Sequence, residues 1–240
     1  MSAKGSLIWQ GALALLAASL CVALGFWQLR RLDWKQAMLQ TIEARAHAAP
    51  APLPLQEAWP RLSADDYEWR HVRARGRFDL AHVALVFTTA PETAVGAEPG
   101  YLAFTPFRLE TGGVVLVNRG FTPQSKAEAG RFRTEPADET EVEGWLRAPQ
   151  KPNFFTPADD PARGKWFSAE PAKIAAAFGI SNTAPFVLEQ EGAGAEGLIR
   201  ARAADLSQIP NNHFGYALTW FGLALALAII FAVYAKGRLS

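Results

Sequence analysis

The sequence contains very little cysteine and no excess of charge of either sign. Cys21 is the only cysteine, so the chain can form no internal disulfide and offers no pair of thiolates for copper or zinc. Lysine and arginine number 24 against 23 aspartate and glutamate residues, which gives a formal net charge of +1. Because nucleic-acid binding needs clustered basic residues to neutralise phosphates, we expect no nucleic-acid partner.

Signatures of catalysis are also missing. No serine lies in a Gly-x-Ser-x-Gly elbow, and His47, His71 and His82 lack the spacing that places two metal ligands on one helix face. Those histidines are expected to be surface or strand polar residues. The pairs Asp65-Asp66 and Asp159-Asp160 are typical of turns and caps, because neighbouring side chains point in different directions. We therefore predict that the chain is not an enzyme, and a hydrolase with an unrecognised site is the least favoured alternative.

Two long uncharged apolar stretches are present, one near each end. The first runs from Leu7 to Leu29 and is closed by Arg30 and Arg31, and the second runs from Phe214 to Tyr234. At about 1.5 Å per residue, each is long enough to cross a hydrocarbon layer of about 30 Å. A cleaved signal peptide usually has an apolar region of only about 7–15 residues. Both stretches therefore predict transmembrane helices.

Charges near the two spans give divided evidence about topology. Arg30 and Arg31 after the first span favour a cytoplasmic central segment, whereas Lys236 and Arg238 after the second favour the opposite. Loops longer than about 60 residues cross membranes largely regardless of charge, so we expect the central domain outside the cytoplasm. Only six residues precede the first span, which leaves no room for an arginine-rich presequence. We expect a multi-pass protein of a bacterial inner membrane with a periplasmic central domain.

These observations divide the chain into six parts, with a linker rich in proline and alanine before the central domain. The predicted parts are a cytoplasmic N-terminus (1–6), transmembrane helix 1 (7–29), a linker (30–60), a periplasmic β-rich domain (61–206), transmembrane helix 2 with its lead-in (207–234) and a cytoplasmic C-terminus (235–240).

The central domain shows short segments of strand character separated by Gly, Pro and Asp clusters. Alternating apolar and polar residues predict antiparallel strands, and Gly112-Gly113 is typical of a hairpin turn. Ser168, Pro171 and Gly179 bracket a short predicted helix as cap, first-turn proline and closing glycine. The predicted fold is a mainly-β, barrel- or sandwich-like domain with a short helix. The predicted strands are 69–78, 83–88, 101–109, 114–121, 142–146, 186–189 and 198–203.

Three separated motifs are distributed along the chain. They are LGFWQLRR at 24–31 with Trp34-Lys35, Gly100-Tyr101 with Thr105-Pro106-Phe107 and VLVNRGF at 115–121, and NNHF at 211–214 with YALTWFG at 216–222. Their order and spacing cover essentially the whole chain, and together they resemble the Surfeit locus protein 1 family, called the Shy family in yeast, of cytochrome c oxidase assembly factors. A weaker match to the family comprises Lys151-Pro152-Asn153 and Trp166-Phe167, where this chain has Glu170 in place of a common aspartate.

The resemblance implies a non-enzymatic factor that binds haem a transiently and assists its insertion into oxidase subunit I. It also implies His213 as the ligand of the haem iron, with the oxidase of the aa3 type. Subunit I is the implied partner, haem a synthase is a second candidate, and the lipid bilayer surrounds the spans. The alternative is a membrane-tethered scaffold for oxidase subunits that binds no cofactor.

Elementary chemistry makes the position of His213 plausible as a ligand site. Asn211 or Asn212 can cap the last helix, which places His213 in its first turn, where the helix dipole favours a neutral imidazole. Tyr216 and Trp220 follow three and seven residues on, and can line a cleft for a flat apolar macrocycle.

Two further features of the motifs have open roles. Trp27 is expected at the same membrane face as His213, where it can pack over haem, although interfacial anchoring explains it equally well. Asn118-Arg119-Gly120 is interpreted as a strand end entering a turn, and its function is left open.

Overall fold

The computed structural model describes residues 3–89, 98–128, 139–192, 198 and 211–239. It divides into two compact units, one of Met1–Thr41 with Leu206–Ser240 and one of Ile42–Asp205. Two long helices, α1 (Ala3–Ala46) and α5 (His213–Leu239), begin and end the described chain. Between them lie β1 (Ala51–Pro52), η1 (Gln56–Arg61), α2 (Ala64–Tyr67), β2 (His71–Phe78), β3 (Ala84–Thr88), β4 (Gly100–Leu109), β5 (Val114–Pro123), α3 (Gln124–Glu128), β6 (Thr140–Arg147), η2 (Pro161–Arg163), α4 (Pro171–Ala177) and β7 (Thr183–Gln190).

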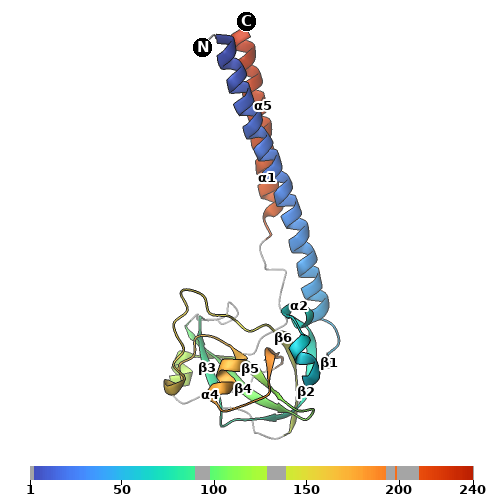
Figure 1. Ribbon diagram of the computed structural model, residues 1–240, viewed down its shortest axis with the longest axis vertical. Helices are drawn as coiled ribbons and strands as arrows, with labels where there is room; N and C mark the ends of the chain where they lie inside the picture. The colour runs from blue at the N-terminus through green and yellow to red at the C-terminus, as the bar shows by residue number, and fades with distance from the viewer. Residues whose placement is uncertain (1–2, 90–97, 129–138, 193–197, 199–210, 240) are drawn as a thin grey trace. The chain divides into compact units, whose positions relative to one another are not determined.

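The helical unit consists of α5 packed antiparallel against α1 (Figure 1). Small residues allow a close approach, since a Cβ atom at Gly25 would lie 2.5 Å from the Phe221 ring, and one at Gly11 would lie 2.9 Å from the Phe231 ring. Such small-residue contacts are a common basis of helix association in membranes. Both helices are long and apolar enough to cross a membrane.

Helix α1 extends well past the predicted end of the first span. It continues beyond Arg31 to Ala46, so the segment predicted as a linker over 30–60 begins as helix. Residues 32–46 contain no proline or glycine and many strong helix formers, whereas prolines follow at 50 and 52. With 44 residues the helix is about 66 Å long, roughly twice the hydrocarbon thickness of a bilayer. The apolar span therefore leads into a helical extension.

The second unit contains a closed β-barrel. Strands β2, β6, β7, β5 and β4 are hydrogen-bonded in that order, and the pairing of β2 with β4 closes the ring. Strands β1 and β3 extend the sheet at its two ends. The prediction of a mainly-β domain is confirmed. Of the two predicted forms, barrel and sandwich, the structure is a barrel. Two pairs, β1 with β2 and β5 with β7, run parallel, which alternation of residue types does not reveal.

Two hydrophobic cores explain why the sequence of β5 is almost continuously apolar. Val115 and Val117 point into the core that fills the barrel, together with Phe107 and Phe186. Leu116 points the other way, into a second core that Trp166 and the residues of α4 cover. Because both faces of β5 are buried, its first four residues, Val114–Val117, are all apolar.

Most predicted elements occur where they were expected. Six of the seven predicted strands correspond to β2–β7, while 199–203 of the seventh lie outside the described residues, as do 207–210 of the predicted lead-in. Gly112 and Gly113 form the turn between β4 and β5 with φ of +95° and +80°, and Gly179 follows α4 with φ of +68°. The predicted cap of the short helix is wrong, because Glu170 occupies the N-cap position of α4.

Ser168 has another role, as part of a hydrogen-bonded cluster around Asp159. The Asp159 carboxylate, whose side chain is only 2% exposed, accepts hydrogen bonds from the backbone N–H of Phe167 and from the Ser168 hydroxyl. The Lys173 ammonium from α4 lies 2.7 Å from the same carboxylate. The acidic pairs are therefore structural, as predicted: Asp160 caps η2, and Asp66 completes a capping box with Ser63.

Replacing Asp159 with asparagine should destabilise the barrel unit in a pH-dependent way. Burial alone would raise the pKa of the Asp159 carboxyl, but Lys173 and the surrounding donors outweigh it and hold the pKa below its usual value. The stabilisation is therefore complete above the unfolded pKa of about 3.9, and is lost as the pH falls through the lower folded value. We expect a loss of about 1–3 kcal/mol at pH 7 in urea unfolding. That loss should shrink at pH 3, and an equal loss at both pH values would contradict the assignment.

Candidate functional site

His213 is the first residue of α5 and faces α1. The carbonyl of Asn212 accepts the first hydrogen bond of the helix, from the N–H of Tyr216, so His213 lies in the first turn as predicted. The Nδ1 atom of His213 lies 2.8 Å from Oε1 of Gln28 on α1. This contact joins two positions that are 185 residues apart in the sequence.

The hydrogen bond to Gln28 determines which nitrogen of the imidazole is available. Oε1 of Gln28 is the amide atom that faces the ring, and an amide oxygen can only accept, so in this arrangement Nδ1 of His213 donates the proton. In the neutral ring, Nε2 then has the lone pair. Histidines that bind metals commonly have this arrangement, in which a partner fixes the tautomer and the ring orientation through the other nitrogen. His213 is thus prepared to act as a ligand through Nε2.

The aromatic residues predicted around His213 are divided between two environments. Ala217 is 1% exposed and Trp220 is half-buried, so these two lie on the same side of α5 as His213. Tyr216 is 56% exposed and lies on the outer side of the helix. Trp27 neighbours Gln28 in α1, and its side chain is 54% exposed.

Gln28 is the functional candidate that sequence reasoning did not single out. It is one of the few polar residues of the first apolar stretch, where polar side chains generally have a partner. Gln10, another such residue, accepts a hydrogen bond from the Tyr234 hydroxyl of α5 at 3.1 Å. The polar residues of the first span therefore indicated that this span packs against another helix that carries polar side chains.

The motif Asn118-Arg119-Gly120 does not end a strand, which corrects the sequence interpretation. It lies inside β5, where the pairing with β4 shifts by one residue. Gly120 has a φ of +128°, and its N–H donates to Oδ1 of Asn118 at 3.1 Å. Arg119 is fully buried, with its guanidinium carbon 4.7 Å from the centre of the Phe78 ring. The motif thus forms a β-bulge that places an arginine inside the barrel.

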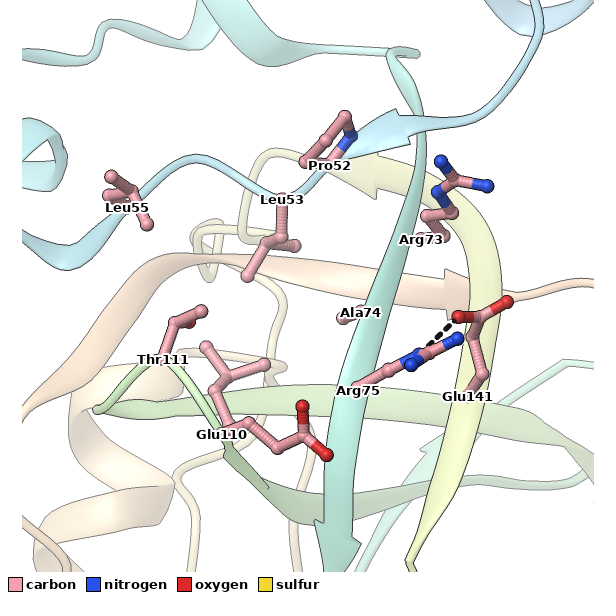
Figure 2. Close-up of a pocket in the computed structure, with 10 residues that line it drawn as sticks. Pro52, Leu53, Leu55, Arg73, Ala74, Arg75, Glu110, Thr111 and Glu141 are labelled. Carbon is pink, nitrogen blue, oxygen red and sulfur yellow. Dashed lines mark hydrogen bonds and ion pairs between the residues drawn. The ribbon is translucent and has the colours of Figure 1, made fainter.

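Two hollows bordered by described residues of the barrel unit differ in their lining, which is charged in one and aromatic in the other. One, of about 400 Å³, lies beside β1 and is bordered by Arg73, Glu110 and the ion pair between Arg75 and Glu141, whose Nε and Oε2 are 2.7 Å apart (Figure 2). Because Arg75 and Glu141 form an ion pair, their charges in this hollow compensate each other. The second, of about 480 Å³, is lined by aromatic residues, including Phe87 and Phe167, which are in edge-to-face contact.

Comparison with known proteins identifies the family. The model of the SURF1 family matches residues 15–225, a range that contains all three motifs and the Gln28–His213 pair. The chain belongs to the SURF1 family.

Relatives of this SURF1 family member occur in animals and bacteria. Surfeit locus protein 1 of Mus musculus is 30% identical over 234 residues, which cover 90% of this chain and 72% of that protein. The human protein of the same name is 28% identical over 226 residues, covering 86% and 71%. A SURF1-like protein of Rickettsia felis is 27% identical over 230 residues, covering 94% and 96%.

Membership of the SURF1 family implies a role as a cytochrome c oxidase assembly factor rather than as a catalyst. Together with the two apolar helices, the bacterial relative indicates a membrane protein. The site around His213 is therefore considered in the context of oxidase assembly.

Proposed function

We propose that this chain binds haem a transiently through His213 and assists its insertion into subunit I of an aa3-type cytochrome c oxidase. The observation that carries the proposal is the hydrogen bond from Nδ1 of His213 to Gln28, because it leaves Nε2 as the ligand atom. The same role makes subunit I the expected partner of this chain and haem a synthase a second partner. We further propose that the barrel unit lies in the periplasm of a bacterial inner membrane, which the positive charges of Lys236 and Arg238 in the last turn of α5 support.

The residues around His213 fit a flat, apolar macrocycle with a central iron. Haem iron is a Lewis acid that binds a neutral imidazole nitrogen, and His213 would hold it. Trp220 is half-buried on the side of α5 that carries His213, and Tyr216 offers an exposed ring one turn away. Trp27 would approach the macrocycle from α1. A single histidine at a partly exposed position suits transient binding, because the receiving protein can compete for the iron.

The proposal is tested by the absorption spectrum of the full chain, purified in detergent from cells that make haem a. The intact protein should carry haem a, and His213→Ala should lose it because no imidazole remains at the start of α5. His82→Ala is a matched control, since His82 lies in the barrel unit and pairs with Asp79 at 3.1 Å. An unchanged haem a signal in His213→Ala would show that the ligand is a different residue.

A second candidate function is a membrane-tethered scaffold that contacts oxidase subunits through the barrel and binds no cofactor. The aromatic hollow favours it, because Phe87 is 38% exposed there beside Tyr101 and Phe167. Exposed aromatic clusters are typical of protein contact surfaces. The same spectrum separates the two functions: a scaffold would copurify with oxidase subunits and show no haem a.

A further inference from the structure

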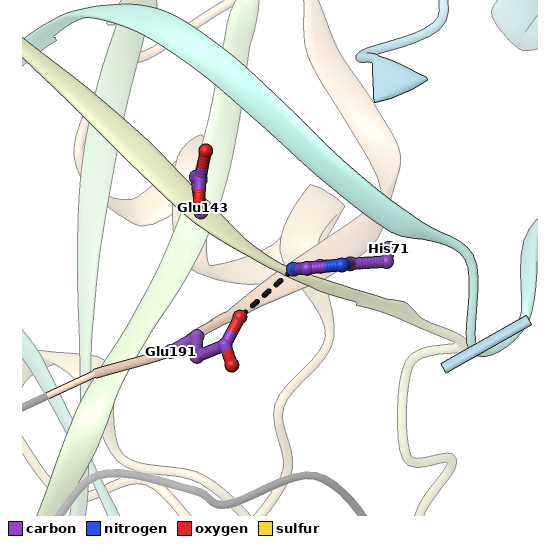
Figure 3. A group of neighbouring side chains, drawn as sticks. All are labelled: His71, Glu143 and Glu191. Atoms are coloured by element: carbon purple, nitrogen blue, oxygen red, sulfur yellow. Dashed lines mark hydrogen bonds and ion pairs between the residues drawn. The ribbon is translucent and has the colours of Figure 1, made fainter. Parts of the chain in front are cut away.

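Three potential metal ligands meet at the surface of the barrel unit, far from His213 in the sequence. His71 begins β2, Glu143 lies in β6, and Glu191 directly follows β7. One ligand atom from each lies within 4.8 Å of the others, and Figure 3 shows the side chains converging. The N–H of Glu191 donates to the carbonyl of Glu143 at 2.9 Å, so the backbone holds the two carboxylates close together.

The ring of His71 is fixed in position and in tautomer. Its Nδ1 lies 2.8 Å from the carbonyl oxygen of Ala48, which can only accept, so Nδ1 carries a proton. The ring stacks on Trp145, with centroids 5.5 Å apart and planes 22° apart. The indole N–H of Trp145 in turn donates to the carbonyl of Ala46 at 2.9 Å. This support resembles the outer hydrogen bonds that orient metal-binding histidines.

The tautomer of His71 directs a lone pair at the carboxylate of Glu191. With a proton on Nδ1, the neutral ring presents the Nε2 lone pair, and this atom lies 2.8 Å from a carboxylate oxygen of Glu191. Two acceptors at that distance repel each other unless a positively charged species lies between or beside them. A second proton on His71 relieves this repulsion, and so does a metal ion bound by both atoms.

Glu143 favours a metal ion over a proton. A proton on His71 would pair with one carboxylate only, whereas a divalent ion can bind Nε2 of His71 and both carboxylates together. We propose that His71, Glu143 and Glu191 bind a divalent first-row transition-metal ion. Nitrogen and carboxylate donors suit Zn²⁺ and its neighbours, and the absence of thiolate disfavours Cu⁺.

The observed distances are close to those of a bound site. At ligand distances of about 2.0–2.1 Å, two donors of a tetrahedral ion are about 3.4 Å apart. The His71–Glu191 pair would therefore open by about half an ångström, and the exposed Glu143 side chain has room to move inward. The ion would link β2, β6 and the end of β7, and through Ala48 it would also fix the chain that leaves α1. This site is independent of the proposed haem function.

The test is a titration with Co²⁺ of the full chain, purified in detergent without a polyhistidine tag and stripped of metal by a chelator. Cobalt bound to nitrogen and oxygen donors should give visible d–d absorption that saturates at one ion per chain, and Zn²⁺ should displace it. His71→Gln and Glu143→Gln should each abolish or strongly weaken the band. His82→Gln should not, because among the described residues His82 has only Asp79 as a carboxylate neighbour in an ion pair.

Glu143→Gln keeps the test decisive if His71→Gln fails to fold, since no described hydrogen bond uses the exposed Glu143 side chain. Absence of a cobalt band in the intact protein, with nitrogen NMR showing a doubly protonated His71, would overturn the proposal in favour of an ion pair. Equal cobalt binding by the intact protein and Glu143→Gln would also overturn it. Haem a content is unaffected by either outcome.

Discussion

Replacing Gly144 with alanine should cost the barrel unit about 3–4 kcal/mol of unfolding free energy, a loss large enough to deplete the protein from cells. Gly144 lies in β6 between β2 and β7, where it pairs with Val72 and Gln190. A Cβ atom built there would lie only 1.9 Å from the backbone carbonyl oxygen of Glu189. Because backbone atoms cannot move aside as a flexible side chain can, the strands would have to separate.

The measurement is urea unfolding of the full chain in detergent, followed by the fluorescence of Trp59, Trp145 and Trp166, which are all buried in the barrel unit. Gly164→Ala is the matched control. Gly164 has a backbone conformation that disfavours side chains, with φ of +66°, but nothing lies within 4 Å of its would-be Cβ. It should lose only about 1–2 kcal/mol. Equal losses at the two positions would mean that the strands around Gly144 adapt.

The sequence predicted the elements of the fold better than their connections. Strand positions follow from alternation and turn residues, and Gly112 and Gly113 mark their hairpin because each has a positive φ. Closure of the barrel depends on the pairing of Gly76 with Leu109, which no local pattern encodes. The full length of α1 was missed because the charges at 30 and 31 were used to end a membrane span, although charge ends only the apolar part of a helix.

The same distinction holds for the candidate sites. The position of His213 could be predicted because a capping asparagine and a helix start are local features, and the structure places it at the start of α5. Its role as a ligand was implied by the resemblance and stays a prediction. The role of Gln28 depends on a contact across the helix pair. His71 was interpreted as a strand polar residue because its neighbours Glu143 and Glu191 come from other parts of the barrel. Ligand sets assembled from several strands leave no spacing signature in the sequence.

Replacing Gln28 with leucine should weaken haem a binding by about 10–100-fold, the usual effect of removing the hydrogen-bond partner of a metal-binding histidine. Leucine fills a similar volume but cannot accept the proton of Nδ1, which lies 2.8 Å from the Gln28 oxygen. The His213 ring would then be free to rotate, and the Nε2 lone pair would no longer be fixed. Gln28→Glu should largely restore binding, because a carboxylate oxygen can accept the same proton.

Haem a content per chain, measured by absorption of the full chain in detergent, reports this effect. Gln10→Leu is the matched control, since Gln10 makes the equivalent cross-helix hydrogen bond to Tyr234 near the other end of the pair. If Gln28 acts only by holding the helices together, the two leucine variants should lose haem a equally and Gln28→Glu should show no special recovery. A loss of haem a in Gln28→Leu alone, reversed in Gln28→Glu, would instead identify Gln28 as the residue that positions the ligand. The reason is that Gln28 contacts the His213 ring, whereas Gln10 contacts Tyr234.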